Sequence, residues 1–436
     1  MKIFFNIFLI YIFSFKYEYS QIITFPFKRI LSHIINETNF YSNYEENKIY
    51  TSIDIGTPPK KLEVQIKMKQ YSLCIRKDDS IYEYNSSSSY KKNEDEFSHT
   101  KYNSDYERAI PSNETFILGN KNDKLYDFKF LLTTLTWYNM YGIIGLQIQE
   151  NERKTINYNL VPQLKRKGLI NKEVFFFNFN ENNDNGELII GQYPHLLDNF
   201  KDNYFEEQIQ TTGIHIQSED IYYNLIFRSV FWNGTELHNM ITIEINIETG
   251  YIIGTKSFEE YSIRFFSPYI KNNKCVKKYV NKVYGAFICD DYPDLNIESF
   301  PNLIFYNSDM NYSFVFTYRD LFKKKDNKIY YMVVFDQRGY NNKWTVGNIF
   351  IRNTMMVFDM DNKIIGIYDK SKKKEIIVKE KYNIVNVTIY IVVIAITCAI
   401  IVGLIAFIIF KFVCKKKSKK AYELKEDFEY TTVINE

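Results

Sequence analysis

An acidic residue at the end of an apolar stretch is the first feature of this chain that could do chemistry. Glu248 follows the alternating residues Ile245-Asn246-Ile247, and Thr249 and Gly250 come directly after it. The glycine permits a tight turn, and the threonine can hold that turn with a side-chain hydrogen bond. A carboxylate would thus be held rigidly at the end of a buried strand. If Glu248 is half of a catalytic carboxylate pair, we expect a second loop of this kind in the first half of the chain.

Strands are the elements expected to position such loops. Tyr50 to Ile55 alternates between apolar and polar residues, Gly56-Thr57-Pro58-Pro59 predicts a turn, and Leu62 to Ile66 alternates again, so a β-hairpin is predicted. The polar stretch from Lys77 to Tyr106 is typical of an exposed insertion. Other predicted strands lie in 128–135, 174–179, 186–191, 222–231, 236–247 and 344–368, the last with a short helical middle, and a short helix is predicted in 161–169. The expected class is mainly β, because strands and helices do not alternate as in a parallel sheet.

Length and charge restrict the class of protein. The 436 residues suffice for two domains or one large bilobed domain with a sizeable core. The net charge of +3 argues against a nucleic-acid partner, which would favour a strong basic excess. The 37 tyrosines and 36 phenylalanines are attributed to a compositional bias rather than to ligand binding. Nothing resembles a phosphate-binding loop, so no cofactor or metal site is predicted.

Two apolar segments predict a membrane protein. Met1 to Ser20 has the charged start and the short apolar core of a signal peptide, with a retained anchor as the alternative. Residues 387–410 are apolar and long enough to span a bilayer. Lysines follow this segment, which places residues 411–436 in the cytosol. The expectation is a single-pass type I protein of the secretory pathway, an endomembrane or the cell surface, with a juxtamembrane stalk at 373–386.

A lumenal ectodomain would be open to glycosylation and to disulfide formation. Of its three cysteines, Cys275 and Cys289 form the simplest disulfide, which leaves Cys74 buried and outside it. In the tail, Tyr430-Thr431-Thr432-Val433 fits the short motif that clathrin adaptors read as an extended peptide. The candidate glycosylation sites are Asn36, Asn85, Asn113, Asn233 and Asn311.

Several segments together resemble the pepsin-like aspartic proteases. Ile55-Gly56-Thr57-Pro58-Pro59 is similar to the turn of that family's first hairpin, and Tyr141-Gly142-Ile143-Ile144-Gly145-Leu146 to its Asp-Gly-Ile-Leu-Gly-Leu segment. The strands near Phe175 to Phe179 and Gly186 to Gln192 resemble a later pair. Residues 344–367 resemble the closing block around Trp-X-Leu-Gly-Asp. The resemblance spans about residues 48–369. It implies two β lobes with one Asp-Thr/Ser-Gly loop each, and the late apolar segment resembles membrane-anchored members such as some plasmepsin-type and secretase-type proteases.

The resemblance places substituted residues at both catalytic positions. Lys67-Met68-Lys69 falls where the first Asp-Thr-Gly is expected, and Leu73-Cys74-Ile75 fits the Leu-Trp-Val that follows it in the family. Glu248 falls where the second aspartate is expected, with Thr249 and Gly250 kept as the supporting loop. The catalytic mechanism requires two carboxylates about 3 Å apart that share one proton. A lysine beside a glutamate would form an ion pair instead, unless Lys67 points to solvent. Tyr102 is the candidate for the family's flap tyrosine.

The resemblance also implies the division of the chain and its function. Residues 21–47 are expected to be a pro-segment-like or first-strand region, 48–205 the N-terminal lobe and 206–372 the C-terminal lobe. The predicted function is that of a catalytically inactive member whose interlobe cleft binds a peptide or a protein. One alternative is an active aspartic endopeptidase that uses Glu248 and a second, unidentified acid. Another is an adhesion or structural protein that keeps the fold as a scaffold.

Overall fold

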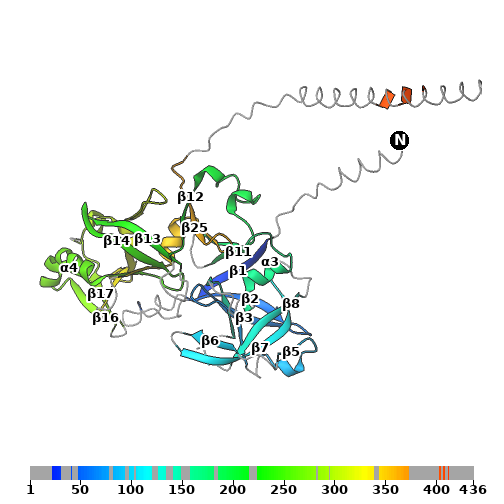
Figure 1. Cartoon of the computed structure of the whole chain (residues 1–436). Helices are drawn as coiled ribbons and strands as arrows, with labels where there is room; N and C mark the ends of the chain where they lie inside the picture. The colour runs from blue at the N-terminus through cyan, green and yellow to red at the C-terminus, as the bar shows by residue number, and fades with distance from the viewer. Residues whose placement is uncertain are drawn as a thin grey trace, which may run out of the picture. The chain divides into compact units, whose positions relative to one another are not determined.

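The computed structural model describes two large β-sheets and four α-helices within residues 22–372 (Figure 1). The described residues are 22–30, 41, 48–77, 82–93, 98–102, 105–119, 126–133, 141–148, 158–180, 185–215, 223–280, 283–293, 295–337, 343–372, 402–403, 406–407 and 411. The expected signal peptide, the candidate glycosylation site Asn36, the tail motif of Tyr430 and Val433, and most of the expected membrane span lie outside these residues.

The first sheet contains strands from both ends of the chain. In spatial order it runs β12 (Ile209–Gly213), β25 (Ile364–Tyr368), β24 (Met356–Asp359), β10 (Val174–Phe179), β11 (Asn185–Ile190), β1 (Ile23–Ile30), β2 (Lys48–Ile55), β3 (Lys60–Lys67), β9 (Gly142–Gly145), β4 (Leu73–Arg76), β8 (Tyr126–Thr133), β7 (Asp105–Ile117) and β5 (Lys91–Lys92), with β6 (Ser98–Tyr102) paired to β7. Strands β2 to β9 make up the N-terminal lobe. The first and last described strands meet in one part of this sheet, and its strands β1, β10, β11, β12, β24 and β25 are called the shared strands below.

The second sheet makes up the C-terminal lobe. Its order is β19 (Tyr312–Phe316), β18 (Leu303–Asn307), β13 (Asn224–Trp232), β14 (Thr235–Ile245), β23 (Trp344–Val346), β15 (Ile252–Gly254), β22 (Val333–Asp336), β17 (Tyr284–Asp290), β21 (Lys328–Tyr331) and β20 (Phe322–Lys325), with β16 (Cys275–Val280) paired to β17. The helices are α3 (Leu160–Arg166), α4 (Lys256–Lys271), α5 (Tyr318–Leu321) and α6 (Asn348–Asn353), and 3-10 turns occur at 84–86, 194–196, 206–208 and 297–299. The class predicted from the sequence, mainly β with two lobes, is confirmed.

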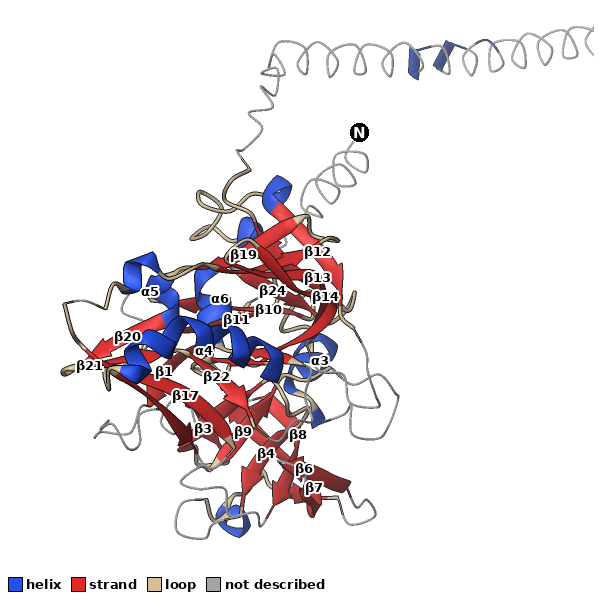
Figure 2. Cartoon of the chain, turned by 90° about the vertical axis from the view of Figure 1, so that its left-hand side faces the viewer, coloured by secondary structure: helices blue, strands red, loops and turns tan. Residues whose placement is uncertain are grey.

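Local sequence accounts for the elements nearest the two loops. Strands β2 and β3 alternate as predicted and pair in an antiparallel hairpin with Ile53 opposite Leu62. Helix α4 begins at a capping threonine, because the side chain of Thr255 accepts a hydrogen bond from the main-chain nitrogen of Phe258 at 3.3 Å. Phe258 and Phe266 lie eight residues apart on one helix face and are both fully buried. This face packs the helix against the C-terminal lobe, near β22 (Figure 2) and in contact with β16.

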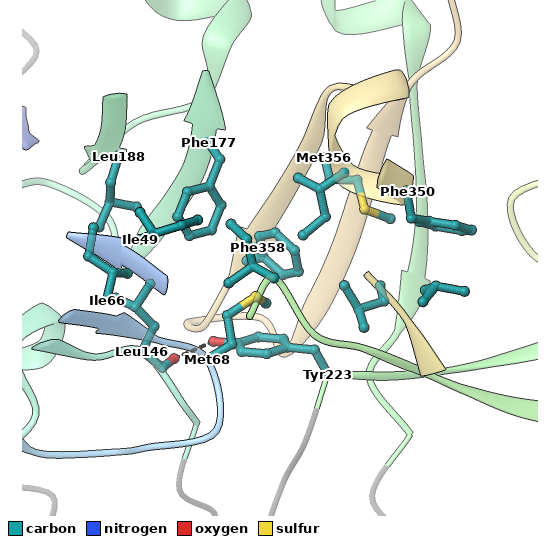
Figure 3. Packing of buried hydrophobic residues seen from close by; sticks show 14 of the residues in the cluster. Ile49, Ile66, Met68, Leu146, Phe177, Leu188, Tyr223, Phe350, Met356 and Phe358 are labelled. Carbon is teal, nitrogen blue, oxygen red and sulfur yellow. Dashed lines mark hydrogen bonds between the residues drawn. The ribbon is translucent and has the colours of Figure 1, made fainter. Parts of the chain in front are cut away.

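One continuous apolar core joins the two lobes through the shared strands. Phe358 of β24 stacks on Phe175 of β10 with ring centroids 5.0 Å apart, and it also meets Tyr223 edge-on at 4.9 Å. Figure 3 shows the core around Phe358 and Tyr223, with Ile66 and Met68 of the N-terminal lobe on one side and Phe350 of the C-terminal lobe on the other. Burying so many aromatic side chains removes a large apolar area from water, which is the main stabilising contribution to such a fold.

The polar stretch from Lys77 to Tyr106 was expected to be an exposed insertion, and most of its residues with described side chains are exposed or half-buried, but Tyr82 is buried at 3% exposure. Its hydroxyl donates to a carboxylate oxygen of Glu114, which is itself fully buried, at 2.7 Å. The hydrogen bond offsets part of the penalty for burying the acid, so β5 and the 3-10 turn beside it are anchored to β7.

Among the described residues, no helix is both long and apolar enough to cross a membrane.

Candidate functional site

Each candidate loop lies within an arrangement of three strands, and the arrangement is the same in the two lobes. In the N-terminal lobe β3 runs parallel to β9, and β4 returns antiparallel to β9. In the C-terminal lobe β14 runs parallel to β23, and β15 returns antiparallel to β23. Residues 68–72 and 246–251 connect these strands, so each loop lies where a chain leaves one strand and enters the next. Lys67 is the last residue of β3 and directly precedes the first loop.

A glycine in each arrangement fixes which loop residues correspond. A Cβ atom on Gly145 would stand 2.4 Å from the carbonyl oxygen of Gln70, and one on Gly347 would stand 2.1 Å from that of Thr249. Both glycines therefore allow a loop to approach where no side chain fits. A main-chain nitrogen just after each glycine donates a hydrogen bond to the same loop carbonyl. The nitrogen of Asn348 bonds to the carbonyl of Thr249 at 2.8 Å, and that of Gln147 to the carbonyl of Gln70 at 2.9 Å.

By this correspondence, the residue of the C-terminal lobe that is equivalent to Lys67 is Asn246 and not Glu248. Lys67 pairs with Gly145, and Asn246 is level with Gly347 because Ile245 pairs with Val346. The returning strands agree, since Cys74 faces Ile143 and Ile253 faces Thr345, each residue lying seven positions after its loop residue. The assignment of Glu248 to the second aspartate position is therefore corrected. Glu248 lies two residues further on and corresponds to Lys69.

Asn246 acts as the local brace of the second loop. Its side-chain oxygen accepts from the main-chain nitrogen of Glu248 at 3.0 Å, and its amide nitrogen donates to the Thr249 hydroxyl at 3.2 Å. Such a side chain mimics a main-chain turn, which is a common use of asparagine. Thr249 therefore supports the loop as expected, although its partner is Asn246. With a side-chain amide at this position, the loop supplies no carboxylate there.

Glu248 forms the ion pair with Lys67 that was expected from the sequence. The Lys67 Nζ and Glu248 Oε2 atoms are 3.3 Å apart, and the two side chains are 9% and 19% exposed. Lys67 therefore does not extend into solvent. The other oxygen of Glu248 is buried and has no hydrogen-bond partner among the described residues. A polar atom left in this state carries a cost in stability of about 1–3 kcal/mol.

A second charged cluster lies next to this pair and was not foreseen. Glu244 of β14 is buried and contacts the ammonium groups of Lys69 from the first loop and Lys343, the latter at 2.5 Å. Burial raises the pKa of the Glu244 carboxyl, but the two lysines lower it by more, so its pKa lies below the ordinary value. Lys69 and Glu244 come from different lobes. The cluster therefore ties the first loop to the C-terminal lobe alongside the Lys67–Glu248 pair.

A neutral contact between the lobes accompanies the charged ones. The Tyr223 hydroxyl donates to the carbonyl oxygen of Leu146, just after β9 (Figure 3). Tyr223 and Leu146 are almost fully buried, as is Met68, which stands where the resemblance implied a hydroxyl residue. Burial raises the pKa of the Tyr223 phenol, which keeps its proton available for the carbonyl. The first loop is thus packed as an apolar contact, where the family pattern has a polar one.

The remaining predicted site residues lie away from the two loops. Tyr102 ends β6 and pairs with Asp105 of β7, so its main chain sits at the tip of a hairpin, while its side chain lies outside what the structure describes. The Cys275–Cys289 disulfide is confirmed and joins β16 to β17, and Cys74 is buried on β4 outside it. Of the candidate glycosylation sites, Asn85, Asn233 and Asn311 are exposed and Asn113 is half-buried.

Potential metal ligands do not gather in the described part of the chain. No group of three or more His, Cys, Asp or Glu side chains lies close enough there to hold an ion. The acids nearest the loops, Glu244 and Glu248, both face lysines, whose ammonium groups compete with a cation for their oxygens.

Comparison with known proteins supports the fold. The family model described as eukaryotic aspartyl protease matches residues 48–369. Among solved structures, the crystal structure of basic 7S globulin from soybean is similar, with a TM-score of 0.58 and 13% sequence identity. The alignment covers 80% of this chain and 95% of the soybean chain. At this identity the likeness concerns the fold alone. No curated protein matches the sequence.

Proposed function

The chain belongs to the eukaryotic aspartyl protease family, and from this premise we propose that it is a non-catalytic member that binds a peptide or a protein. The observation that carries the proposal is the pair of residues at the corresponding loop positions, Lys67 and Asn246. Aspartic hydrolysis requires two carboxylates about 3 Å apart that share one proton, so that one activates water as a base while the other is an acid. Neither position supplies a carboxylate.

Glu248 does not replace the missing pair. It is a single acid, displaced by two residues from the corresponding position, and Lys67 lies 3.3 Å from its carboxylate. A misplacement of about 1 Å can by itself lower a rate about 100-fold. The acid of the neighbouring cluster, Glu244, forms ion pairs with two lysines, Lys69 and Lys343. An endopeptidase that used Glu248 with a second acid would have to break one of these ion pairs.

We further propose that the protein is a single-pass membrane protein of type I in the secretory or endomembrane system. The proposal rests on the apolar segments 1–20 and 387–410 and on the lysines after the second of them. The Cys275–Cys289 disulfide supports passage through an oxidising compartment. The motif from Tyr430 to Val433 would then be available to clathrin adaptors, and the exposed Asn85, Asn233 and Asn311 to glycosylation.

The loss of catalysis is tested with the purified chain and casein at acidic pH, with and without pepstatin. We expect no pepstatin-sensitive cleavage. Cleavage that pepstatin blocks and that Glu248→Ala abolishes would refute the proposal and favour the active endopeptidase. A restoration experiment tests the positions themselves. Lys67→Asp with Asn246→Asp places carboxylates at both corresponding positions, while Lys67→Asp with Glu248→Asp is the matched control, and only the first variant should gain activity.

Peptide binding is tested by capture. The chain is incubated with a defined mixture of synthetic peptides, washed and eluted in acid, and the eluted peptides are identified by mass spectrometry. A binding protein should retain a reproducible subset of sequences. The soybean globulin, which bears the same fold, serves as a control for retention by the fold alone. Equal retention of all peptides by both proteins would favour a scaffold without a binding site.

A further inference from the structure

Strand β16 forms an open edge of the C-terminal lobe sheet (Figure 1). It pairs with β17 on one side, from Cys275 opposite Cys289 to Val280 opposite Tyr284. No other strand in the described part of the chain pairs with it. A strand of six residues is about 20 Å long. The main-chain groups along such an edge are a template to which a further strand can add.

The hydrogen bonds to β17 show which main-chain groups face the open side. The carbonyl oxygen of Lys274, directly before β16, accepts a hydrogen bond from the nitrogen of Asp290 at 2.9 Å. In an antiparallel ladder, residues bonded in this way alternate with residues whose nitrogen and carbonyl point away from the partner strand. Cys275, Lys277 and Tyr279 therefore direct these groups away from β17. The Cα atoms of the disulfide pair agree with this, because at 4.0 Å they are as close as a pair without main-chain bonds.

Both faces of this edge present an exposed apolar side chain. Val276 and Lys278 lie on one face, and Lys277 and Tyr279 lie on the other, because side chains alternate along a strand. Val276 is 44% exposed and Tyr279 is 64% exposed. A peptide that adds to a sheet edge obtains affinity from main-chain hydrogen bonds and specificity from alternate side chains. Both kinds of contact are available along β16.

The charge of the edge indicates which kind of strand it takes. Residues 271–278, Lys-Asn-Asn-Lys-Cys-Val-Lys-Lys, contain four lysines and no acid. The acids at the end of β17 contact lysines of other strands, since Asp290 pairs with Lys328 of β21 and Asp291 with Lys324 of β20. The edge therefore carries an excess of positive charge. Lysines oppose the pairing of β16 with a second copy of itself, and they favour an acidic strand.

We propose that β16 is a docking site for an extended acidic segment of another protein, which adds to the C-terminal lobe sheet as a further strand. The outward main-chain groups of Cys275, Lys277 and Tyr279 hold the segment by hydrogen bonds. Acidic side chains of the segment pair with the lysines, and apolar ones cover Val276. This site contains none of the residues of the two loops, so the proposal does not rest on the peptide-binding function proposed above.

Three fluorescein-labelled hexapeptides test the proposal on the full chain by fluorescence anisotropy. The first alternates Glu and Val, the second alternates Glu and Pro, and the third alternates Lys and Val. The second has the charge of the first, but its prolines lack the N–H groups that a ladder needs. We expect the Glu-Val peptide to bind at least about tenfold more tightly than either of the others. Equal binding of the Glu-Pro peptide would overturn strand addition, and equal binding of the Lys-Val peptide would overturn the selection of acids.

A proline variant locates the binding on the main chain of β16. Tyr279→Pro removes one N–H from the open side and leaves the pairing with β17, because this nitrogen points away from that strand. It should weaken the binding of the Glu-Val peptide about tenfold, whereas the matched control Tyr279→Ala, which removes only the ring, should weaken it no more than about threefold. Equal affinities of these two variants would contradict the assigned edge.

A charge variant keeps the proposal testable if Tyr279→Pro does not fold. Lys278 is exposed, and Lys278→Glu should weaken the binding of the Glu-Val peptide at least about tenfold. Lys277 is left unaltered, because its ammonium group contacts the buried Glu259. Lys60→Glu, at an exposed lysine of β3 in the N-terminal lobe, is the matched control and should bind as the unaltered chain does. Equal affinity of the Lys278→Glu chain and the unaltered chain would overturn the site.

Two further results distinguish this proposal from its alternatives. Sedimentation should give the same mass for the unaltered and Tyr279→Pro chains, whereas a dimer that Tyr279→Pro dissolves would show that β16 pairs with a second copy and would overturn the acidic partner. If the anisotropy experiment fails while the chain still retains a subset of peptides in the capture experiment, the β16 site is refuted and the peptide-binding function stands.

Discussion

Lys67 and Glu248 show how a change of residue type alters what one position can do. Two carboxylates at close range repel each other and share a proton, whereas a carboxylate and an ammonium group attract each other and keep their charges. The pair is largely withdrawn from water, with exposed fractions of 9% and 19%. A buried ion pair is often no more stable than the apolar pair that could replace it. Its presence between the lobes is therefore better explained by the arrangement it specifies than by the stability it adds.

The stability of this pair should depend on both partners together. Glu248→Gln removes the counter-charge of a lysine whose side chain is 9% exposed, and we expect it to lower the free energy of unfolding by about 2 kcal/mol, less than for a fully buried pair because Glu248 is partly exposed. Lys67→Met should cost a similar amount. The double variant should be close to the unaltered chain, since neither charge is then left alone. Urea denaturation of the four proteins measures this, and simple addition of the two single effects would contradict it.

The Glu244 cluster should make stability fall in acid. The pKa of Glu244 in the folded chain is below its ordinary value of 4.5, so the carboxyl binds fewer protons folded than unfolded between the two pKa values. Its contribution is therefore fully present above pH 4.5 and is lost as the pH falls through the folded pKa. The urea midpoint should decline below this pH, and Glu244→Gln should flatten the decline. Glu63→Gln, at a partly exposed ion pair with Lys28, is the control and should leave the pH profile unchanged.

At the scale of elements, close approach of backbones explains why the two loops keep their place. Gly145 and Gly347 each stand where a loop carbonyl presses against a strand, and they do so at corresponding points of the two lobes. The loops can change their chemistry, as Lys67-Met68-Lys69 shows, without losing this contact. The geometry of the strands is thus separable from the identity of the residues that the loops present.

Gly347→Ala should therefore be strongly destabilising. The added Cβ would meet the carbonyl oxygens of Thr249 and Tyr251, at 2.1 and 2.6 Å, and both belong to the main chain and cannot move aside as a flexible side chain could. We expect a loss of about 3 kcal/mol, at the upper end of the range for overpacking. Gly213→Ala is the matched control on β12, where nothing lies within 4 Å, and its effect should stay within about 0.5 kcal/mol. Thermal or urea unfolding distinguishes the two, and equal losses would contradict the argument.

The disulfide joins the two strands of a hairpin that follows helix α4, and β16 of this hairpin contacts the helix. Cys275 and Cys289 are directly paired on β16 and β17 and are 14 residues apart in the sequence. A cross-link that closes a loop of this length stabilises a protein by about 3 kcal/mol, mainly by restricting the unfolded chain. Replacing both cysteines by serine should lower the free energy of unfolding by about that amount, as measured by urea denaturation without reductant. Addition of reductant should then leave the double variant unchanged, whereas a further loss would show that the disulfide is not the redox-sensitive element.

At the scale of the molecule, neither lobe is complete without the shared strands. Strands β24 and β25, the last described strands, pair with β10 and β12, while β1, the first described strand, pairs with β11 and β2. In the core, Phe358 of β24 packs against both Phe175 of β10 and Tyr223, which precedes β13. The Lys67–Glu248, Lys69–Glu244 and Tyr223–Leu146 contacts add polar links across the lobes. We therefore expect the two lobes to unfold together.

A single transition tests this expectation. Two of the three tryptophans, Trp232 and Trp344, lie in the second sheet, so tryptophan fluorescence reports mainly on the C-terminal lobe, while far-ultraviolet circular dichroism reports on all strands. The two curves should coincide. Phe358→Ala should shift both by the same amount, about 3–5 kcal/mol, and Val315→Ala, at a 45% exposed position, should shift neither. Two separate transitions would show that the lobes fold independently.

Some features could be predicted from the sequence because they depend on neighbouring residues. The β2–β3 hairpin follows from alternation and a turn, and the position of Lys67 follows from its fixed distance to the strand that begins at Leu73. The disulfide followed from a choice among few cysteines. The family pattern across residues 48–369 fixed the mainly β class. Helix α4 was missed, because an aromatic helix face has no distinctive local signal in a chain this rich in aromatic residues. The anchoring of Tyr82 was missed, because no local signal shows that Glu114 is buried.

The second loop is where local sequence and tertiary structure disagree. Glu248-Thr249-Gly250 resembles the expected motif. The number of residues between the loop and Ile253, and the contact of Gly347 with the loop, nevertheless make Asn246 the equivalent of Lys67. The spacing from this loop to Gly254 was the available signal. The sequence by itself determined that neither loop carries the family's aspartate. Only the tertiary structure decided which residues face each other and that Lys69 reaches Glu244, because each of these contacts depends on strands and loops that are far apart in the chain.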